Sequence, residues 1–367
     1  MRKAFPKIFS LGVPSRTMTV KAPLAVIYLG RRGGGAKITK NISEDLQTSN
    51  IFSLMTICVR KDNELIKEYD QSRVATLFDN LTSARTLSKI IQYALFPTRL
   101  LSDTGLSMTG VCLVPMISPL GLIIEGLLRA QGVTVIRLLH DFEKHPGDTW
   151  PPSFLIRRIV KNSKFLITLS TEVASKVKEL NPNIGLSIYP HPAFDFSTSK
   201  TLESTSKKYI LFIGRIRKYK GIENLIAAFF NLDLKDTELV IAGEGKSQIK
   251  PDPRIRFINR WLEEYEITSL VQNAEVVAFP YIEASQSGLL PYCVMENKKV
   301  VATPLPGLLE QTVGYKNAYI AKNFDVDCLS HALAAAMESE TFRMKSDSRT
   351  TKNIEKCLLE TGFFTKK

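Results

Sequence analysis

Short apolar runs alternate with segments of helical spacing along the whole chain. In the first half, the apolar runs that predict buried strands are residues 24–29, 51–59, 74–78, 110–114, 133–139 and 165–169. Apolar residues three or four positions apart predict helices near residues 36–47, 82–98, 119–131 and 171–180. Strands that alternate with helices are typical of parallel α/β layers.

A second series of the same kind begins at Tyr209. Its predicted strands are residues 209–213, 237–242, 255–258, 275–279, 299–303 and 317–320. We therefore predict an N-terminal domain (1–196), a polar Ser/Thr-rich linker (197–208), a C-terminal domain (209–340) and a last helical stretch within 341–367. The expected architecture is two Rossmann-like, doubly wound α/β domains that face each other across a cleft and bind ligands at strand carboxyl ends.

Residues 104–124 carry no charge and are numerous enough to span a bilayer. They contain Pro115, Pro119 and three glycines. A strand, a proline-rich turn and a helix that begins near Pro119 explain this composition better than a membrane span. The basic start of the chain is a poor signal peptide, because Pro6 and Lys7 interrupt its apolar run.

Two cations follow the first predicted strand of the second half. The strand ends at Gly214, Arg215 and Lys220 follow in a loop, and Gly221 opens a segment of helical spacing. Arg offers forked donors and Lys a mobile point charge, so cations at the carboxyl end of a parallel strand suit a diphosphate. The alternative is two solvated basic side chains in a strand–helix loop.

A later strand leads into a loop rich in small hydroxyl residues, Glu-Ala-Ser-Gln-Ser-Gly at 283–288. We expect Gly288 to open a helix. Backbone N–H groups and the dipole at a helix N-terminus attract anions. Ser285, Ser287 and Gly288 are therefore candidates for contacts to the distal phosphate of a nucleotide.

These segments, with the strand and glycine turn at 239–245, resemble the carboxyl-terminal domain of family 4 glycosyltransferases, which have the GT-B fold. The resemblance implies that Arg215 and Lys220 hold the diphosphate of a nucleotide-sugar donor and that the loop with Gln286 binds this donor. It also implies retention at the anomeric carbon, no bound metal, and a last helix that crosses back to the first domain.

The 283–288 loop departs from the family motif, which has two glutamates separated by seven residues. Aligned from residues 300–303, those positions fall on Ala284 and Tyr292, and Glu283 lies one residue early. Glu283, as a catalytic residue, and Tyr292, as a donor ligand, are candidates for the two roles. Residues 307–310 match a later Gly-x-x-Glu element of the family. Its last residue, Glu310, is expected to face the nucleotide or to cap a helix.

In the first half, glycines at 33–35 join the first strand to a helix and allow a ligand to approach the backbone closely. They resemble the glycine loop over the donor sugar in GT-B enzymes, so Gly34 and Gly35 are donor-binding candidates. The spacing does not fit the dinucleotide motif GxGxxG. Arg31 and Arg32 are candidates for phosphate or membrane contact, or are simply exposed.

His140 and Asp141 follow a buried strand. The resemblance implies that His140 lies beside the anomeric centre, and Asp141 is expected to orient His140 or the acceptor hydroxyl. His145 is a weaker candidate for an acceptor phosphate. His191, between two prolines, is predicted to be structural, and His331 lies on an apolar helical pattern.

Two further features suggest ligands only weakly. Trp261 follows a strand where the family holds its nucleotide base, and both base stacking and core packing remain open. The Asp325-Val-Asp327 triplet resembles a metal-binding motif, but acidic residues are favourable at a helix start. We predict neither a metal nor another cofactor.

The formal net charge is +13 and lies mostly in the first half, where residues 1–196 hold 25 Lys/Arg against 15 Asp/Glu. A surface this basic favours an anionic partner, here an acidic membrane leaflet. The sequence lacks the interleaved basic and aromatic residues that would indicate nucleic-acid binding. Five scattered cysteines without a CxxC pair fit a reducing compartment.

The sequence thus predicts transfer of a hexose from a nucleotide diphosphate sugar to a hydroxyl of a lipid-linked glycan. The expected setting is surface-polysaccharide synthesis, such as that of lipopolysaccharide, at the cytoplasmic face of the plasma membrane. The rivals are a GT-B-fold nucleotide-sugar epimerase, an anion- or nucleic-acid-binding protein and a periplasmic two-domain binding protein.

Overall fold

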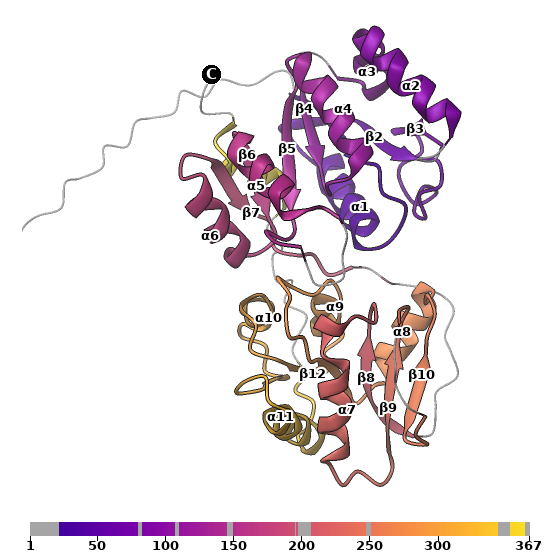
Figure 1. Cartoon of the computed structure of the whole chain (residues 1–367), viewed down its shortest axis with the longest axis vertical. Helices are drawn as coiled ribbons and strands as arrows, with labels where there is room; N and C mark the ends of the chain where they lie inside the picture. The colour runs from indigo at the N-terminus through magenta and orange to yellow at the C-terminus, as the bar shows by residue number, and fades with distance from the viewer. Residues whose placement is uncertain are drawn as a thin grey trace, which may run out of the picture.

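The computed structural model describes residues 22–79, 83–106, 110–144, 150–194, 196, 207–246, 251–343 and 353–363. Two α/β units lie one above the other, joined near residues 190–207 (Figure 1). Each unit is built on one parallel sheet. The predicted fold class, two doubly wound domains, is confirmed.

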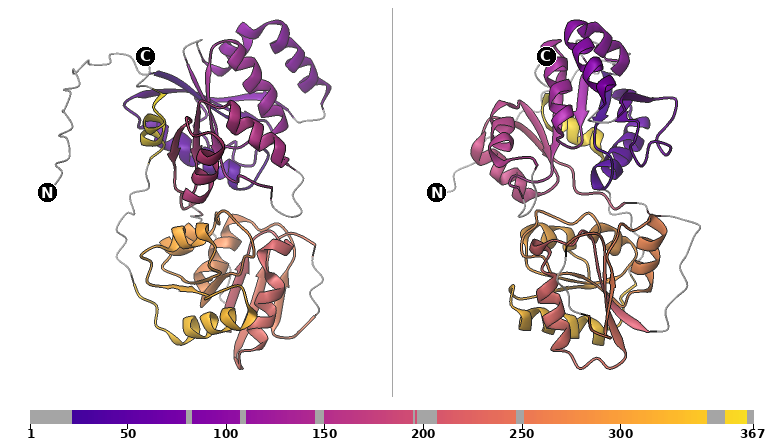
Figure 2. Two further views of the ribbon diagram at one scale, coloured as in Figure 1. Left: turned by 60° about the vertical axis from the view of Figure 1, so that its left-hand side comes forward. Right: turned by 45° about the vertical axis from the view of Figure 1, so that its right-hand side comes forward.

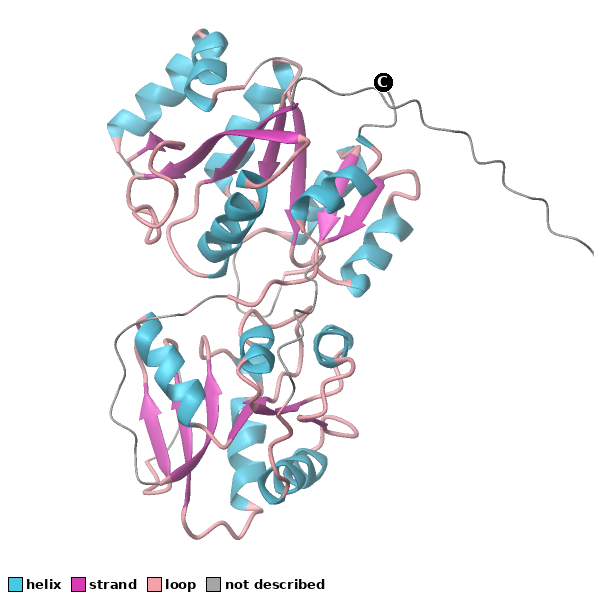
Figure 3. Cartoon of the chain, turned by 180° about the vertical axis from the view of Figure 1, so that it is seen from behind, coloured by secondary structure: helices cyan, strands magenta, loops and turns pink. Residues whose placement is uncertain are grey.

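The first sheet has the order β3-β2-β1-β4-β5-β6-β7. Its strands are β1 (Ala22–Tyr28), β2 (Phe52–Arg60), β3 (Val74–Phe78), β4 (Val111–Val114), β5 (Thr134–Leu139), β6 (Phe165–Thr168) and β7 (Gly185–Ile188). Its helices are α1 (Gly34–Gln47), α2 (Ala84–Leu95), α3 (Pro97–Thr104), α4 (Pro119–Ala130), α5 (Ser153–Asn162) and α6 (Thr171–Leu180). The helices cover both faces of the sheet (Figure 3).

The second sheet has the order β10-β9-β8-β11-β12-β13. Its strands are β8 (Lys208–Ile213), β9 (Thr237–Ala242), β10 (Ile255–Ile258), β11 (Val276–Phe279), β12 (Lys299–Ala302) and β13 (Ala318–Ile320). The helical elements are η1 (Lys218–Lys220), α7 (Ile222–Phe230), α8 (Glu264–Asn273), α9 (Leu290–Met295), α10 (Pro306–Thr312), α11 (Val326–Glu338) and α12 (Ile354–Glu360).

The end of the described chain returns to the first domain. Helix α12 packs against β7 and α1, far from α11 in the second domain (Figure 2). Ile354, Cys357 and Leu358 are fully buried there, and Glu360 accepts a hydrogen bond from the Ser187 hydroxyl at 2.6 Å. The chain therefore crosses between the domains twice.

Several boundaries differ from the sequence prediction. The single helix expected at 82–98 is two helices, because Pro97 cannot continue α2 and instead starts α3. Strand β7 and helix α5 were not predicted. The last helical stretch, expected within 341–367, is shorter than that range: residues 341–343 are not helical, and α12 spans Ile354–Glu360.

The uncharged stretch 104–124 is part of the α/β layers. It holds β4, buried along its whole length at the centre of the first sheet, and the start of α4. Ser118 caps α4 by accepting a hydrogen bond from the N–H of Gly121 at 3.0 Å. Among the helices described, none is long and apolar enough to cross a membrane.

Candidate active site

A cavity of about 490 Å³ lies between the two domains. Its walls are the segments that follow β1, β2, β5 and β7 in the first domain and β8, β10 and β11 in the second. This position follows from the topology, because parallel strands present their carboxyl ends, and the loops that follow, at one edge of each sheet. The volume is within the range of small-molecule sites.

The cavity brings together eight of the thirteen site residues expected from the sequence. They are Gly34, His140, Asp141, Arg215, Lys220, Gln286, Ser287 and Gly288. Their roles in binding or catalysis stay predictions. Gly35, Glu283, Ser285, Tyr292 and Glu310 do not line the cavity.

The two cations come from the loop after β8. Lys220 ends the η1 turn, and its Nζ lies 3.5 Å from the ring centroid of buried Tyr281 and 5.3 Å from that of Tyr219. These rings hold the ammonium group at the cavity wall by cation–π attraction. Gly221 follows with φ of 66°, and a Cβ there would lie 1.9 Å from the carbonyl oxygen of Pro280. Only glycine therefore lets the turn pack against the end of β11.

Helix α10 fastens the 283–288 loop. The N–H of Ser287 donates to Oε1 of Gln311 at 2.9 Å, and Nε2 of Gln311 donates to the carbonyl of Ser287 at 2.8 Å. Helix α9 begins at Leu290 and not at Gly288 as expected, and it has only six residues. The Ser287 amide already has a protein partner. By contrast, Nε2 of Gln286 is buried and has no partner among the described residues, so it is a donor available to a ligand.

The Gly-x-x-Glu element lies behind this loop and does not face the cavity. A Cβ on Gly307 would lie 1.6 Å from the carbonyl oxygen of Ser285. Glu310 accepts hydrogen bonds from the N–H and Oγ1 of Thr171, at 2.9 and 2.8 Å. Glu310 thus caps α6 of the first domain, where a carboxylate favours the positive end of the helix dipole.

The other three residues outside the cavity have different surroundings. Tyr292 is buried and packs edge-on against Phe196, with ring centroids 4.8 Å apart. Gly35 is buried in α1 beside Tyr28 and Met116. Glu283 is exposed. Ala284 and Tyr292 occupy the positions that align with the two family glutamates, and both are buried. Ala284 lines the cavity, whereas Tyr292 packs outside it.

His140 lies on the first-domain side of the cavity. Its Nε2 is 2.8 Å from the carbonyl oxygen of Pro115, which can only accept, so Nε2 carries the proton. Burial lowers the pKa of His140, and the neutral ring leaves Nδ1 as an acceptor. A hydroxyl group of a bound sugar is a suitable donor to this nitrogen.

His191 also lines the cavity, which the sequence did not predict. Its Nδ1 pairs with the carbonyl of Pro192 at 2.9 Å, and its ring packs edge-on against Phe194 at 4.9 Å. Burial lowers the pKa of His191 to about 4, so it is neutral at pH 7. A Cβ on Gly288 would lie 3.3 Å from Nε2 of His191, which places this ring against the donor loop.

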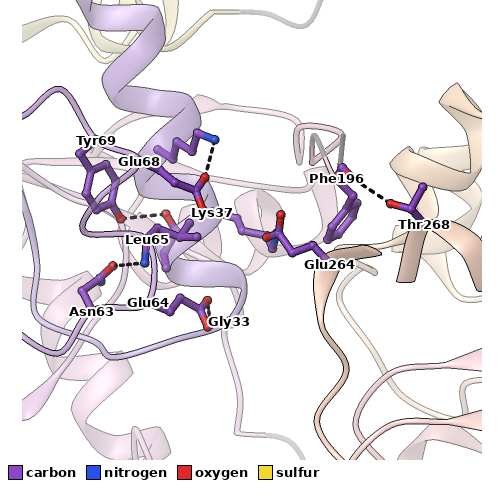
Figure 4. A network of polar contacts seen from close by, with 12 residues as sticks. Gly33, Lys37, Asn63, Glu64, Leu65, Glu68, Tyr69, Phe196, Glu264 and Thr268 are labelled. Carbon is purple, nitrogen blue, oxygen red and sulfur yellow. Dashed lines mark hydrogen bonds and ion pairs between the residues drawn. The ribbon is translucent and has the colours of Figure 1, made fainter. Parts of the chain in front are cut away.

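Glu64 and Glu68 place carboxylates on the first-domain side of the cavity (Figure 4). Glu64 accepts a hydrogen bond from the N–H of Gly33 at 2.6 Å, and its burial raises its pKa. Lys37 forms an ion pair with Glu264 of the second domain, and its Nζ lies 4.1 Å from the centroid of Phe196. The sequence predicted none of these residues, because they have no motif.

Arg32 and Trp261 meet at the rim. The guanidinium carbon of Arg32 lies 4.4 Å from the ring centroid of Trp261, and its Nη2 lies 3.3 Å from Oε2 of Glu244. Trp261 is therefore neither in the core nor unpaired; it faces a first-domain cation across the cleft. Arg32 thus links two loops of the second domain to the glycine loop.

The remaining candidates lie elsewhere. His145 is outside the described residues, and His331 is exposed on α11. Asp325 precedes α11, and Asp327 accepts from Asn231 at 3.2 Å. In the described part of the chain, no three His, Cys, Asp or Glu side chains form a group that could hold a metal ion.

Comparison with known proteins agrees with this geometry. Residues 194–356 match the family model "Glycosyl transferases group 1". No curated protein matches the sequence. The structure is similar to sucrose-phosphate synthase from Thermosynechococcus elongatus, with a TM-score of 0.63 and 13% identity over 86% of this chain and 89% of that one.

Two further solved structures share the fold. Alr3699/HepE from Anabaena, in complex with UDP and glucose, has a TM-score of 0.63 and 12% identity over 93% of this chain and 95% of its own. A protein from Listeria monocytogenes described as a UDP-N-acetylglucosamine 2-epimerase has a TM-score of 0.54 and 9% identity, covering 87% and 89%. The chain has the GT-B fold, and its second domain matches a glycosyltransferase family model.

Proposed function

We propose that this protein is a retaining glycosyltransferase of family 4 that moves a hexose from a nucleotide diphosphate sugar to an acceptor hydroxyl. The observation that carries the proposal is the interdomain cavity, with Arg215 and Lys220 on one wall and His140 on the other. The family match over residues 194–356 and the UDP and glucose bound to a protein of the same fold support it.

The proposed donor lies with its diphosphate against the second domain. When the bond from the anomeric carbon to the phosphate oxygen breaks, negative charge grows on the leaving diphosphate. Arg215, Lys220 and the unpartnered Nε2 of Gln286 are positioned at the cavity to stabilise that charge without a metal. The acceptor oxygen then forms the new bond to the same carbon, and its proton passes to the departing phosphate oxygen.

The proposed sugar lies against the first domain. The neutral His140, with Nδ1 as acceptor, orients a hydroxyl beside the anomeric centre. Gly34 gives the sugar close access to the backbone, and Asp141 is the candidate for orienting the acceptor. Glu283 remains the proposed catalytic residue of the 283–288 loop; its side chain is exposed outside the cavity, so this role requires it to turn inwards.

The acceptor in this proposal is a lipid-linked glycan in surface-polysaccharide assembly at the cytoplasmic face of the plasma membrane. The support is the charge: residues 1–196 carry a net +10, from 25 Lys/Arg and 15 Asp/Glu. Such a surface favours anionic lipids. The basic residues Arg2, Lys3 and Lys7 lie outside the described part of the chain.

Isothermal titration with UDP, GDP, ADP and TDP tests the donor assignment. We expect at least one nucleoside diphosphate to bind more tightly than its monophosphate, because the cavity cations recognise the second phosphate. If none of the four binds to the natively folded protein, the proposal is wrong.

A nucleotide-sugar epimerase is the second candidate, favoured by the likeness to the Listeria protein. It would bind the same donor but act without an acceptor. Incubation of the matching nucleotide sugar with the protein alone separates the two. An isomerised nucleotide sugar supports the epimerase, and product formation only when a glycan acceptor is added supports the transferase.

A further inference from the structure

The outer face of α2 carries a row of exposed apolar side chains. Leu87, Ile91 and Leu95 are four residues apart and are 61%, 51% and 68% exposed. Residues with this spacing lie on one face of a helix, so the three form a continuous stripe. Phe96, 61% exposed, follows directly. We call these four residues the α2 stripe.

The described part of the fold leaves this face exposed. Helix α2 packs onto the first domain through buried Thr86 and Tyr93 and half-buried Ile90. Single exposed apolar residues are ordinary on protein surfaces, but a contiguous apolar row on one short segment marks an interaction surface.

The charges around the stripe are basic. Arg85 is 87% exposed in its side chain, and Arg99 is exposed on α3. Lys89 instead lies on the domain side of α2, with its Nζ 5.8 Å from the Tyr93 ring centroid. Helix α2 contains no acidic residue. The nearby acids are engaged: Asp103 accepts from the Tyr93 hydroxyl at 2.7 Å, and Asp79 lies 3.8 Å from Arg85. A partner for this face must be apolar at its centre and anionic around it.

Helices α2 and α3 lie at the end of the first domain that is remote from the second (Figures 1 and 3). A partner bound there leaves the cleft and the movement of the second domain unobstructed. With 12 residues, α2 is too short to span a bilayer, but it is long enough to lie in the interface.

We propose that the α2 stripe inserts into an anionic lipid bilayer at the level of the headgroups, with Arg85 and Arg99 facing the lipid phosphates. An amphipathic helix with an apolar face and basic neighbours binds such a surface by both effects together. The inference builds on the proposed peripheral location but does not depend on sugar transfer, because none of these residues lines the cavity.

Vesicle co-sedimentation tests the inference. The probes are phosphatidylcholine vesicles with and without about 30% phosphatidylglycerol, and we expect the wild-type protein to bind only the anionic ones. The double variant Leu87→Gln/Ile91→Gln should lower the partition coefficient by about a hundredfold, roughly tenfold for each large apolar side chain removed from lipid.

The matched control is Met295→Gln/Val313→Gln, which replaces two side chains of the second domain that are 51% and 73% exposed. It should bind vesicles like the wild type. Circular dichroism melting should show all three proteins folded, since every replaced side chain is exposed.

Wild-type protein that does not bind anionic vesicles, or an α2 variant that binds them normally, would overturn the proposal. So would a wild-type dimer that the α2 variant converts to a monomer without any change in vesicle binding, because the stripe would then be a contact between two copies. Titration with UDP on the same samples keeps the inference separate from the proposed activity: loss of vesicle binding with UDP binding unchanged supports the α2 stripe.

Discussion

Removing the charge of Lys220 should weaken nucleoside diphosphate binding without unfolding the protein. The substitution Lys220→Met keeps an unbranched apolar stem over the Tyr281 ring, from which Nζ now lies 3.5 Å, and deletes only the ammonium group. A charge-assisted hydrogen bond to phosphate contributes about 1.5–3 kcal/mol, so the dissociation constant for UDP should rise about 10- to 150-fold. Loss of the cation–π contact should cost no more than about 1 kcal/mol of stability.

Lys218→Met is the matched control. Lys218 belongs to the same η1 turn, three residues from Arg215, but it is exposed and does not line the cavity. Its removal changes the net charge equally and should leave the affinity for UDP within about twofold, because exposed charges at a distance are screened.

Isothermal titration with UDP and UMP, at one fixed salt concentration, measures the effect. If Lys220 contacts the second phosphate, the preference for UDP over UMP should shrink in Lys220→Met and persist in Lys218→Met. Unchanged UDP affinity in a natively melting Lys220→Met protein would refute the reasoning, and so would an equal loss in both variants.

Three more predictions concern the two histidines and the packing behind the donor loop. His140→Ala should lower the turnover number about a hundredfold in a transfer assay while UDP affinity changes little, and near-normal turnover would make His140 a structural residue. Because the folded pKa of His191 is about 4 and its ordinary pKa about 6.5, the unfolded chain takes up this proton more readily. The free energy of unfolding should therefore be constant above about pH 7 and fall by up to about 3 kcal/mol towards pH 4; urea denaturation of His191→Gln, which lacks the group, should show a shallower fall. Gly307→Ala should destabilise the protein by about 1–3 kcal/mol and weaken UDP binding, since its Cβ would overlap the Ser285 carbonyl. The control is Gly126→Ala, whose Cβ meets nothing within 4 Å; in thermal melts it should be neutral or stabilising.

The fold could be predicted almost entirely from local patterns. Buried strands such as β8 and β9 contain continuous apolar runs, which Gly214 and Gly243 end, so their existence and order were visible in the sequence. The errors occurred where the local signal was weak. Strand β7 has four residues, Gly185–Ile188, with only one buried, and its place in the sheet depends on pairing with β6. Helix α5 follows two prolines and has no apolar period long enough to stand out.

The site was predicted only in part. Arg215, Lys220 and His140 were predicted to share a site because each lies in a loop that follows a buried strand, and all three line the cavity, since the carboxyl ends of parallel strands converge. For Glu310 the sequence left two roles open, at the nucleotide or as a helix cap, and the structure shows the cap of α6, because a Gly-x-x-Glu spacing does not reveal which element lies opposite. Lys37 and Glu264 are 227 residues apart and meet only in the folded chain.

The sequence by itself determined the two α/β series, the loop between Gly214 and Gly221, the loop at 283–288 and the basic excess of the first half, since these depend on residue spacing and composition. The tertiary structure alone decided which side chains share the cavity and which face of α2 remains uncovered. Both depend on how distant elements pack, and a helix such as α2 has the same sequence period whether its apolar stripe faces a core or solvent. Only the packing of Thr86 and Tyr93 into the first domain shows that Leu87, Ile91 and Leu95 face outwards.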